Sequence, residues 1–276
     1  WTFQPSVEAR QTYTDNLRLA PSGREQGDWI TEITPGFTVS KRSDRVRFDA
    51  TYQLHYFAGP DDLGGEVDRA QSALAARLGA ELVSDWLYFD GAASIRQQPV
   101  SAFGPLLSDR AYANINSTEV RTFSASPYLR HRFGSTATAE LRYVRDKVDT
   151  GRERLGNNHG QTVAFSVNSG SRFTDLGWNL LLREQRIDDE LAPETSAAVA
   201  SFGLRYSLGR TLALTGNVGY DKSDYAALGG VTEGRSWSTG FIYAPSSRTR
   251  VDASVGRRFY GDSYHLSANH RARRAV

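Results

Sequence analysis

The sequence predicts an all-β protein, an antiparallel transmembrane β-barrel of about 14 strands, and three observations lead to that class. Apolar and polar residues alternate over long segments. Several of these segments are longer than an ordinary strand. The connections between them alternate between short and long. We expect residues 1–276 to form a single barrel domain.

The clearest alternation lies in residues 44–57. Successive side chains of a strand point to opposite faces. One face would be apolar, and it carries Val46, Phe48, Ala50, Tyr52, Leu54 and Tyr56. The other would be polar, and it carries Arg45, Arg47, Asp49, Thr51, Gln53 and His55. A globular strand has about 5–6 residues, whereas a tilted strand that crosses a bilayer needs about 9–11. The segment is therefore predicted to cross a membrane.

The same alternation predicts further strands along the whole chain, for example in residues 87–95, 123–133, 198–206 and 212–220. Residues 70–82 are ambiguous, because Leu74, Leu78 and Leu82 also have helical spacing and alanine favours helices. The predicted strands on both sides of this segment favour a strand here too.

The connections give a second signal. Short ones are expected at residues 40–43, 84–85, 134–135, 170–174, 208–210 and 245–247. Long ones are expected at residues 14–28, 58–68, 97–114, 146–159, 187–193 and 222–233, while the last connection, residues 261–263, is short. Bacterial outer-membrane barrels have short periplasmic turns and long extracellular loops. A soluble β-sandwich, the alternative, has no reason to sort its loops in this way. The pattern also predicts a periplasmic N-terminus.

Composition agrees with this class and excludes others. No stretch approaches the roughly 18 apolar residues of a transmembrane helix. The net charge of +2 gives no reason to expect nucleic-acid binding. Cysteine is absent, and methionine is absent even at position 1. The chain therefore starts after processing or is a fragment, and a removed signal peptide fits the first option. With the barrel pattern, we expect the protein to lie in the bacterial outer membrane. The chain does not end in a strand with a terminal aromatic residue, so either more strands follow in the natural protein or the barrel closes in another way. Truncation at the C-terminus is the favoured expectation, because an open edge inside lipid would leave backbone groups unpaired.

Aromatic residues gather where the predicted strands end. Rings with an apolar body and a polar tip are typical of the two membrane interfaces. The interface is predicted to hold Trp29, Tyr56, Trp86, Tyr143, Tyr206, Tyr220, Trp237 and Tyr243, and strand-end aromatics also include Tyr13, Phe57, Tyr88 and Phe133. Ordinary hydrophobic packing is the alternative for any one of them.

Charged residues on the polar parity are predicted to face the barrel lumen, because a charge facing lipid would cost about 2–4 kcal/mol near the midplane. These residues are Arg45, Arg47, Asp49, Arg77, Glu81, Glu140, Arg142, Arg183, Arg205 and Arg258. Their arginines can hold anionic sugars or set ion preference. The alternative is a salt-bridged interior that is plugged or only hydrated.

No enzymatic site stands out, and we expect neither a cofactor, a metal ion nor a catalytic residue. The five histidines lack ligand spacing and are expected to be solvated or to face the lumen. The acidic residues 61–62 and 188–190 are read as solvated loop carboxylates rather than a cation site. Residues 158–159 and 269–270, both Asn-His, invite comparison with barrel-embedded lipases, but no serine beside them is marked as a nucleophile.

Several short motifs resemble the outer-membrane barrel family associated with exopolysaccharide loci, the PEP-CTERM/exosortase-associated barrel group. The matching segments are WTFQP at residues 1–5, YTDN at 13–16, ITPGF at 33–37, SPYL at 126–129 and HRARR at 270–274. The resemblance implies a barrel, generally longer than this chain, whose genes lie beside those for polysaccharide synthesis and export. It implies no catalytic residues.

Together these observations predict an outer-membrane barrel with a mixed-charge lumen that takes part in export or surface handling of an exopolysaccharide. Its expected partners are outer-membrane lipid, the polymer and periplasmic export proteins. Two alternatives stay open: a general diffusion porin, and a structural barrel that anchors partner proteins.

Overall fold

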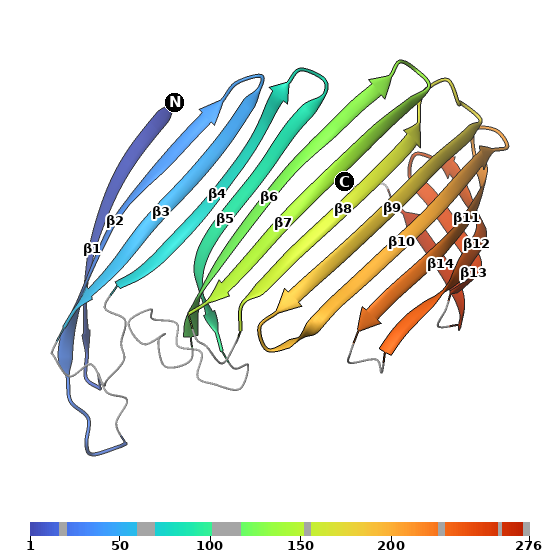
Figure 1. Cartoon of the computed structure of the whole chain (residues 1–276). Helices are drawn as coiled ribbons and strands as arrows, with labels where there is room; N and C mark the ends of the chain where they lie inside the picture. The colour runs from blue at the N-terminus through green and yellow to red at the C-terminus, as the bar shows by residue number, and fades with distance from the viewer. Residues whose placement is uncertain are drawn as a thin grey trace. The chain divides into compact units, whose positions relative to one another are not determined.

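A computed structural model describes residues 1–16, 21–59, 70–100, 117–151, 156–225, 230–258 and 261–272, and every regular element in these ranges is a β-strand (Figure 1). The strands are β1 (Thr2–Thr14), β2 (Asp28–Arg42), β3 (Val46–Ala58), β4 (Ala70–Val83), β5 (Leu87–Pro99), β6 (Ser117–Phe133), β7 (Ala137–Thr150), β8 (Asn158–Ser169), β9 (Leu176–Asp189), β10 (Ala192–Ser207), β11 (Leu212–Tyr225), β12 (Gly230–Ser246), β13 (Thr249–Arg258) and β14 (Gly261–His270). The described part of the chain has no helix that is long and apolar enough to cross a membrane.

All fourteen strands belong to one antiparallel sheet, in which each strand lies beside its neighbours in sequence. This up-and-down order is that of the transmembrane β-barrel class, and it confirms the fold class predicted from the alternation. The strands contain from 10 to 17 residues, which is enough to cross a bilayer at a tilt.

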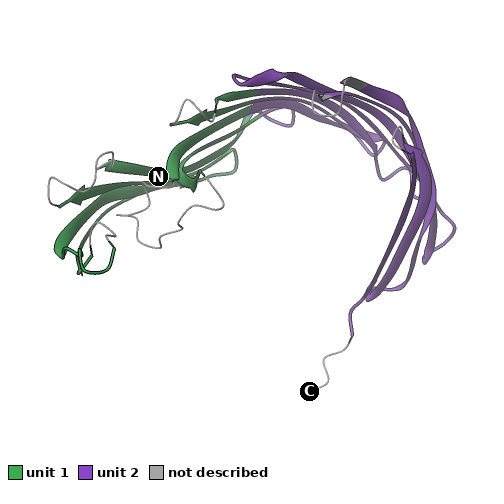
Figure 2. Ribbon diagram, turned by 90° about the horizontal axis from the view of Figure 1, so that it is seen from below, with its two compact units in different colours: residues 1–81, 89–125, 146–159 green, residues 82–88, 126–145, 160–276 purple. Residues whose placement is uncertain are grey.

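The chain divides into two compact units, which Figure 2 shows in green and purple. The first unit contains residues 1–81, 89–125 and 146–159, and the second contains residues 82–88, 126–145 and 160–276. The two units are described separately below. In each, the face that carries the apolar parity is called the apolar face, and the opposite side is called the polar face.

In the first unit, aromatic rings follow one another across the apolar face of β1, β2 and β3. Phe37 is in register with Pro5 on β1 and with Tyr52 on β3. Its ring centroid lies 5.9 Å from that of Phe3 and 5.6 Å from that of Tyr52. Since cross-strand aromatic pairs stabilise a sheet by about 0.2–1 kcal/mol each, these contacts help to fix the register.

The ambiguous segment at residues 70–82 forms strand β4, so the strand interpretation is confirmed. Tyr52 of β3 is in register with Leu74 on the apolar face, and Asp49 is in register with Arg77 on the polar face. The alternation of β3 therefore continues on β4, because neighbouring strands must match their apolar faces.

The second unit has the same two faces. On its apolar face Phe202 of β10 is in register with Leu180 of β9 and with Val218 of β11. The side chains of Phe202, Val218 and Trp237 are all exposed. Among the described residues only a few small or medium apolar residues, and Phe57, are buried. Large apolar side chains thus lie on the outside of the sheet, which is the arrangement of a strand that faces lipid.

The predicted short turns are present. Asp85 in the β4–β5 turn has φ 61° and Gly134 in the β6–β7 turn has φ 56°. Glycine adopts this left-handed conformation without strain, and aspartate tolerates it better than most residues. We call this end of the strands the short-turn end and the opposite end the long-loop end.

Two predicted long loops are wrong. β9 ends at Asp189 and β10 begins at Ala192, so residues 187–193 form a tight hairpin. Similarly, β11 continues to Tyr225 and β12 begins at Gly230, within the segment 222–233. The strands continue because backbone hydrogen bonds do not require apolar side chains, so the polar ends of these strands resemble loops in sequence. In the predicted loop 146–159, β7 continues to Thr150 and β8 begins at Asn158. Residues 17–20, 60–69, 101–116 and 152–155 of the other long connections lie outside the described residues.

Candidate functional site

The polar face of the second unit carries a cluster of tyrosine and arginine side chains on β5, β6 and β7. We call Tyr88, Tyr128, Arg130, Glu140 and Arg142 the Tyr–Arg cluster. The rings of Tyr88 and Tyr128 are stacked, with centroids 5.1 Å apart and an interplanar angle of 13°. The Arg142 guanidinium lies 3.7 Å from the Tyr128 ring centroid. Three adjacent strands therefore contribute one continuous stack of planar groups.

Glu140 holds both arginines of the cluster. Arg130 donates to Glu140 Oε2 from Nε at 2.9 Å and from Nη2 at 2.6 Å, and Arg142 Nε donates to Glu140 Oε1 at 2.8 Å. Charge-assisted hydrogen bonds of this kind are among the stronger ones in proteins. Each carboxylate oxygen thus fixes a different guanidinium, so the arginines are positioned before any ligand arrives.

A buried serine and a backbone bond complete the support. Arg142 Nη1 donates to Ser126 Oγ at 2.9 Å, and Ser126 is buried on the same face. The backbone N–H of Arg130 donates to the Trp86 carbonyl at 2.9 Å, which fixes β6 beside the start of β5. Arg142 is therefore held at Glu140, at Ser126 and against the Tyr128 ring.

The cluster contains two guanidinium groups and one carboxylate, so it is positively charged. Arg132 follows on the same face of β6 and is exposed. Planar guanidinium groups that are already oriented bind carboxylate, sulfate or phosphate groups of a ligand, and the tyrosine hydroxyls add polar partners. The arrangement is suited to binding an anion.

The ten charged residues predicted to face the lumen lie on the polar parity of their segments, and the structure brings some of them together. Glu140 and Arg142 form an ion pair of 2.8 Å. Asp49 is in register with Arg77, and Arg45 in the turn before β3 accepts a backbone bond from Glu81. Each of the other four arginines is in register with an uncharged residue on a neighbouring strand. The pairs are Arg47 with Gly79, Arg183 with Val199, Arg205 with Thr215 and Arg258 with Gly261. That all ten line a lumen stays a prediction.

A second polar group lies on the polar face of the first unit. Glu32 Oε1 lies 2.8 Å from His55 Nδ1, and Thr34 Oγ1 lies 3.2 Å from the same nitrogen. The side chains of His55 and Glu32 are only 8% and 13% exposed. Arg10 on β1 lies 3.9 Å from Glu32 on the neighbouring strand β2. A buried group of this kind, with its partners satisfied, specifies strand register more than it offers a binding surface.

The eight aromatics predicted for the membrane interface are all exposed. Two further strand-end aromatics lie on the other face, contrary to prediction: Tyr88 joins the Tyr–Arg cluster, and Phe57 is 1% exposed on the polar face of β3. His131 was also misplaced, since it lies on the apolar parity of β6, with its ring stacked on Trp86 at 3.9 Å and against Phe133 at 4.7 Å.

The sequence interpretation missed Tyr88, Tyr128 and Arg130 as members of one site. The signal was present, because Tyr88 has the parity opposite to Leu87 and Phe89, and Tyr128 and Arg130 have the parity opposite to Leu129. What parity could not supply was the register between β5, β6 and β7, which brings these residues together.

Within the described ranges, no group of three or more histidine and acidic residues is placed to hold a metal ion. The Asp189 carboxylate accepts the Leu191 N–H at 2.8 Å and so closes the β9–β10 hairpin. The acidic residues 61–62 lie outside the described residues.

No family model matches the chain. No curated protein matches it either. Among solved structures, the chain is similar to a Salmonella typhi OmpF complex with daunomycin (10% identity, 97% of this chain and 96% of that chain, TM-score 0.45). It is also similar to a bacterial polysaccharide outer-membrane secretin (14%, 98% and 91%, TM-score 0.42) and to an anion-selective porin from Comamonas acidovorans (9%, 98% and 95%, TM-score 0.41). At these identities and TM-scores the similarities say nothing about what this protein binds or transports.

Proposed function

We propose that the protein is an outer-membrane β-barrel that takes part in the export or surface handling of an exopolysaccharide, with its polar face lining the passage. The observation that carries this proposal is the Tyr–Arg cluster, in which Glu140 orients Arg130 and Arg142 beside two stacked tyrosines. In the same proposal the short turns and the N-terminus lie in the periplasm and the long loops face outward.

The chemistry of the cluster supports a polymer with acidic sugars. A uronate, sulfate or phosphate substituent matches the planar fork of a guanidinium, and sugar hydroxyls can bond tyrosine hydroxyls and carboxylates. Because the arginines are held by Glu140 and Tyr128, little side-chain entropy remains to be lost when such a group binds. A polymer that must move onward also needs weak contacts, and partial compensation by Glu140 weakens each one.

Single-channel recording tests the proposal directly. The purified full-length protein would be inserted into a planar bilayer, and currents recorded with polygalacturonate, which is anionic, or with dextran of matched length, which is neutral. We expect stepwise conductance that polygalacturonate blocks more strongly than dextran, and weaker block in Arg142→Gln. Block by both polymers to the same extent, or unchanged block in the variant, would contradict a role for the Tyr–Arg cluster.

A general diffusion porin is the second candidate, and the pairing of charges on the polar face favours it. Arg42 lies 3.9 Å from Asp49, and Arg10 lies 3.1 Å from Glu8. Paired charges of both signs give a hydrated wall without a strong preference for one solute. If the protein is a porin, single-channel recording should show conductance that neither polygalacturonate nor dextran blocks. A structural barrel that anchors partner proteins predicts no conductance and proteins that co-purify with it.

A further inference from the structure

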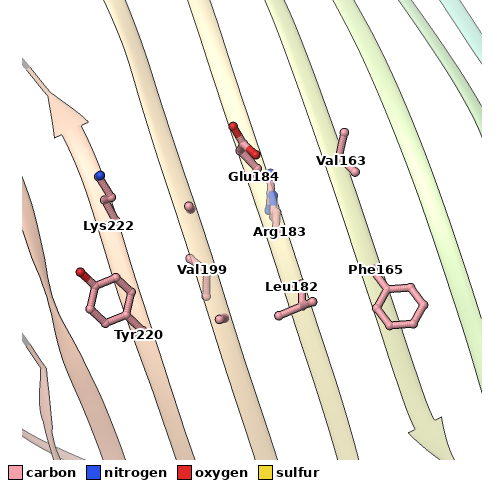
Figure 3. Close-up of a pocket in the computed structure, with 10 residues that line it drawn as sticks. Val163, Phe165, Leu182, Arg183, Glu184, Val199, Tyr220 and Lys222 are labelled. Carbon is pink, nitrogen blue, oxygen red and sulfur yellow. The ribbon is translucent and has the colours of Figure 1, made fainter.

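A groove lies on the apolar face of the second unit, across the middle of β8–β11 (Figure 3). Its volume is ≈ 420 Å³. Ala198 and Ala200 form its floor on β10, and larger apolar side chains on the neighbouring strands form its walls: Val163, Phe165, Leu182 and Tyr220. The groove exists because two small residues on β10 are in register with larger ones on β9 and β11. Its surface is apolar and faces the lipid side.

Charged residues close the groove at the long-loop end. Glu184 and Lys222 flank Ala198 in the same register row. Lys222 Nζ lies 3.9 Å from Glu233, and Glu233 also accepts a hydrogen bond from Tyr220. Glu184 is bonded to Arg186 at 2.6 Å. Both carboxylates at this end of the groove are therefore already bound to groups of the protein.

Arg235 is different. It is in register with Tyr220 and lies on the exposed parity of β12, diagonal to Lys222. Within the part of the chain that the structure describes, no carboxylate lies at ion-pair distance from Arg235. An arginine on the lipid side without a protein counter-ion needs either water or an anionic headgroup.

The inclination of these charges across the strands matches that of a membrane plane. On the apolar face, Glu184 on β9, Lys222 on β11 and Arg257 on β13 are the charges nearest to the apolar rows. Glu184 lies in the same register row as Lys222, whereas Arg257 lies in the same row as Leu180. From β9 to β13, which are four strands apart, the first charged row therefore shifts by four residues along the strand direction. With a rise of about 3.3 Å per residue and strands about 4.8 Å apart, the mean slope over the four steps is about 35°. All of the change falls between Lys222 on β11 and Arg257 on β13. Strands of outer-membrane barrels tilt by about 35–45°. The row of charges then runs parallel to the plane of a membrane.

We propose that this groove binds an acyl chain of a phosphate-bearing membrane lipid, whose phosphate is held by Lys222 and Arg235. The apolar floor and walls accept the chain, and the two cations lie at the level where the headgroup of that lipid would be. The aromatic body of Tyr220 lies between chain and headgroup, as amphipathic rings do at the interface. This site is on the face opposite to the Tyr–Arg cluster and does not depend on the proposed function.

Tryptophan quenching measures this binding. The full-length protein would be reconstituted into phosphatidylcholine vesicles that contain a minor fraction of either phosphatidic acid or phosphatidylcholine with brominated acyl chains. Trp237 is the reporter, because it is exposed on β12 in register with Val218, one row from Tyr220. The contribution of Trp237 is obtained by subtracting the quenching measured for the Trp237→Phe variant from that of the unchanged protein. We expect stronger quenching by brominated phosphatidic acid than by brominated phosphatidylcholine.

The variants separate headgroup from chain. Lys222→Gln or Arg235→Gln should each weaken the preference for phosphatidic acid about fivefold, since a basic residue near a membrane surface contributes about 1 kcal/mol. Ala198→Phe, which fills the groove and keeps all charges, should reduce quenching by the bound lipid. Arg210→Gln, on the exposed turn between β10 and β11 at the other end, is the charge-matched control and should have no effect. Equal quenching by both lipids, or an unchanged signal in Lys222→Gln and Ala198→Phe variants that still show heat-modifiable mobility, would overturn the proposal.

Discussion

The guanidinium of Arg142 lies 3.7 Å from the centroid of the Tyr128 ring, on the polar face of β6 and β7. Cation–π contacts contribute about 0.5–1 kcal/mol when exposed and about 2 kcal/mol when desolvated. Arg142 is part-buried, so the contact belongs in the upper half of that range. It also prevents rotation of the guanidinium, and this explains why Glu140 and Ser126 can both be bonded at short distances.

Loss of the Tyr128 ring should loosen the cluster. Tyr128→Leu keeps an apolar side chain but removes the surface on which Arg142 lies, and we expect the free energy of unfolding to fall by about 1–2 kcal/mol. The urea midpoint in lipid vesicles measures this loss. Tyr128→Phe, which keeps the ring, is the matched control and should lose less than half as much. An equal loss in both variants would mean that the hydroxyl group, and not the ring, supports Arg142.

Neutralising Glu140 should make the polar face more selective for anions. Glu140→Gln leaves Arg130 and Arg142 without their shared counter-ion, so anions should be favoured over cations and the block by polygalacturonate should strengthen. Reversal potentials in a salt gradient measure the first effect. Glu233→Gln, which removes the same charge from the opposite face, is the control. Unchanged reversal potentials in Glu140→Gln would show that ions do not pass the cluster.

The assignment of faces predicts that the same substitution destabilises the protein unequally at two neighbouring positions. Phe202→Arg places a charge on the apolar face of β10, at a cost of about 2–4 kcal/mol if that face meets lipid near the midplane. Ser201→Arg, one residue away on the polar face, should cost under about 1 kcal/mol. Folding yield into vesicles and the urea midpoint distinguish the two. Similar losses in both variants would contradict a lipid-facing apolar side.

The close approach of β12 and β13 at Gly240 predicts that a side chain at this position destabilises the protein. A Cβ on Gly240 would collide with the Ala253 carbonyl and with Ser254, whereas a Cβ on Gly216 meets nothing within 4 Å. Overpacking of this kind typically costs about 1–3 kcal/mol. We expect Gly240→Ala to lower the urea midpoint, and Gly216→Ala to leave it unchanged or raise it. Equal midpoints would mean that β13 can shift without cost.

How far the sequence alone predicts this structure differs between elements. Parity assigned β3 completely, since its alternation from Val46 to Tyr56 places every side chain on the face the structure gives it. It also resolved β4, because apolar faces of neighbouring strands must match. Parity failed at the long-loop ends of β9 and β11. There the polar side chains of strands that extend beyond the apolar rows look like those of a loop.

The candidate site was harder to predict than the fold. Glu140 and Arg142 followed from their parity on β7, but Arg130 became their partner only through the register of β6 with β7. Register depends on backbone pairing and turn length, and a one-residue shift reverses every side chain. Tyr88 was assigned to the membrane interface because aromatic residues at strand ends usually lie there, although its own parity pointed to the polar face.

The row of charges that runs from Glu184 to Arg257 leaves unequal lengths of strand beyond it. The β9–β10 hairpin continues past Glu184 to Asp189, roughly 16 Å along the strand, whereas β13 ends at Arg258, next to Arg257. The sheet of the second unit therefore extends well beyond the row of charges at β9 and β10, whereas at β13 it ends beside that row. A bulky ligand that contacts this edge of the sheet therefore meets hydrogen-bonded backbone at β9 and β10, and it reaches the apolar face sooner at β13.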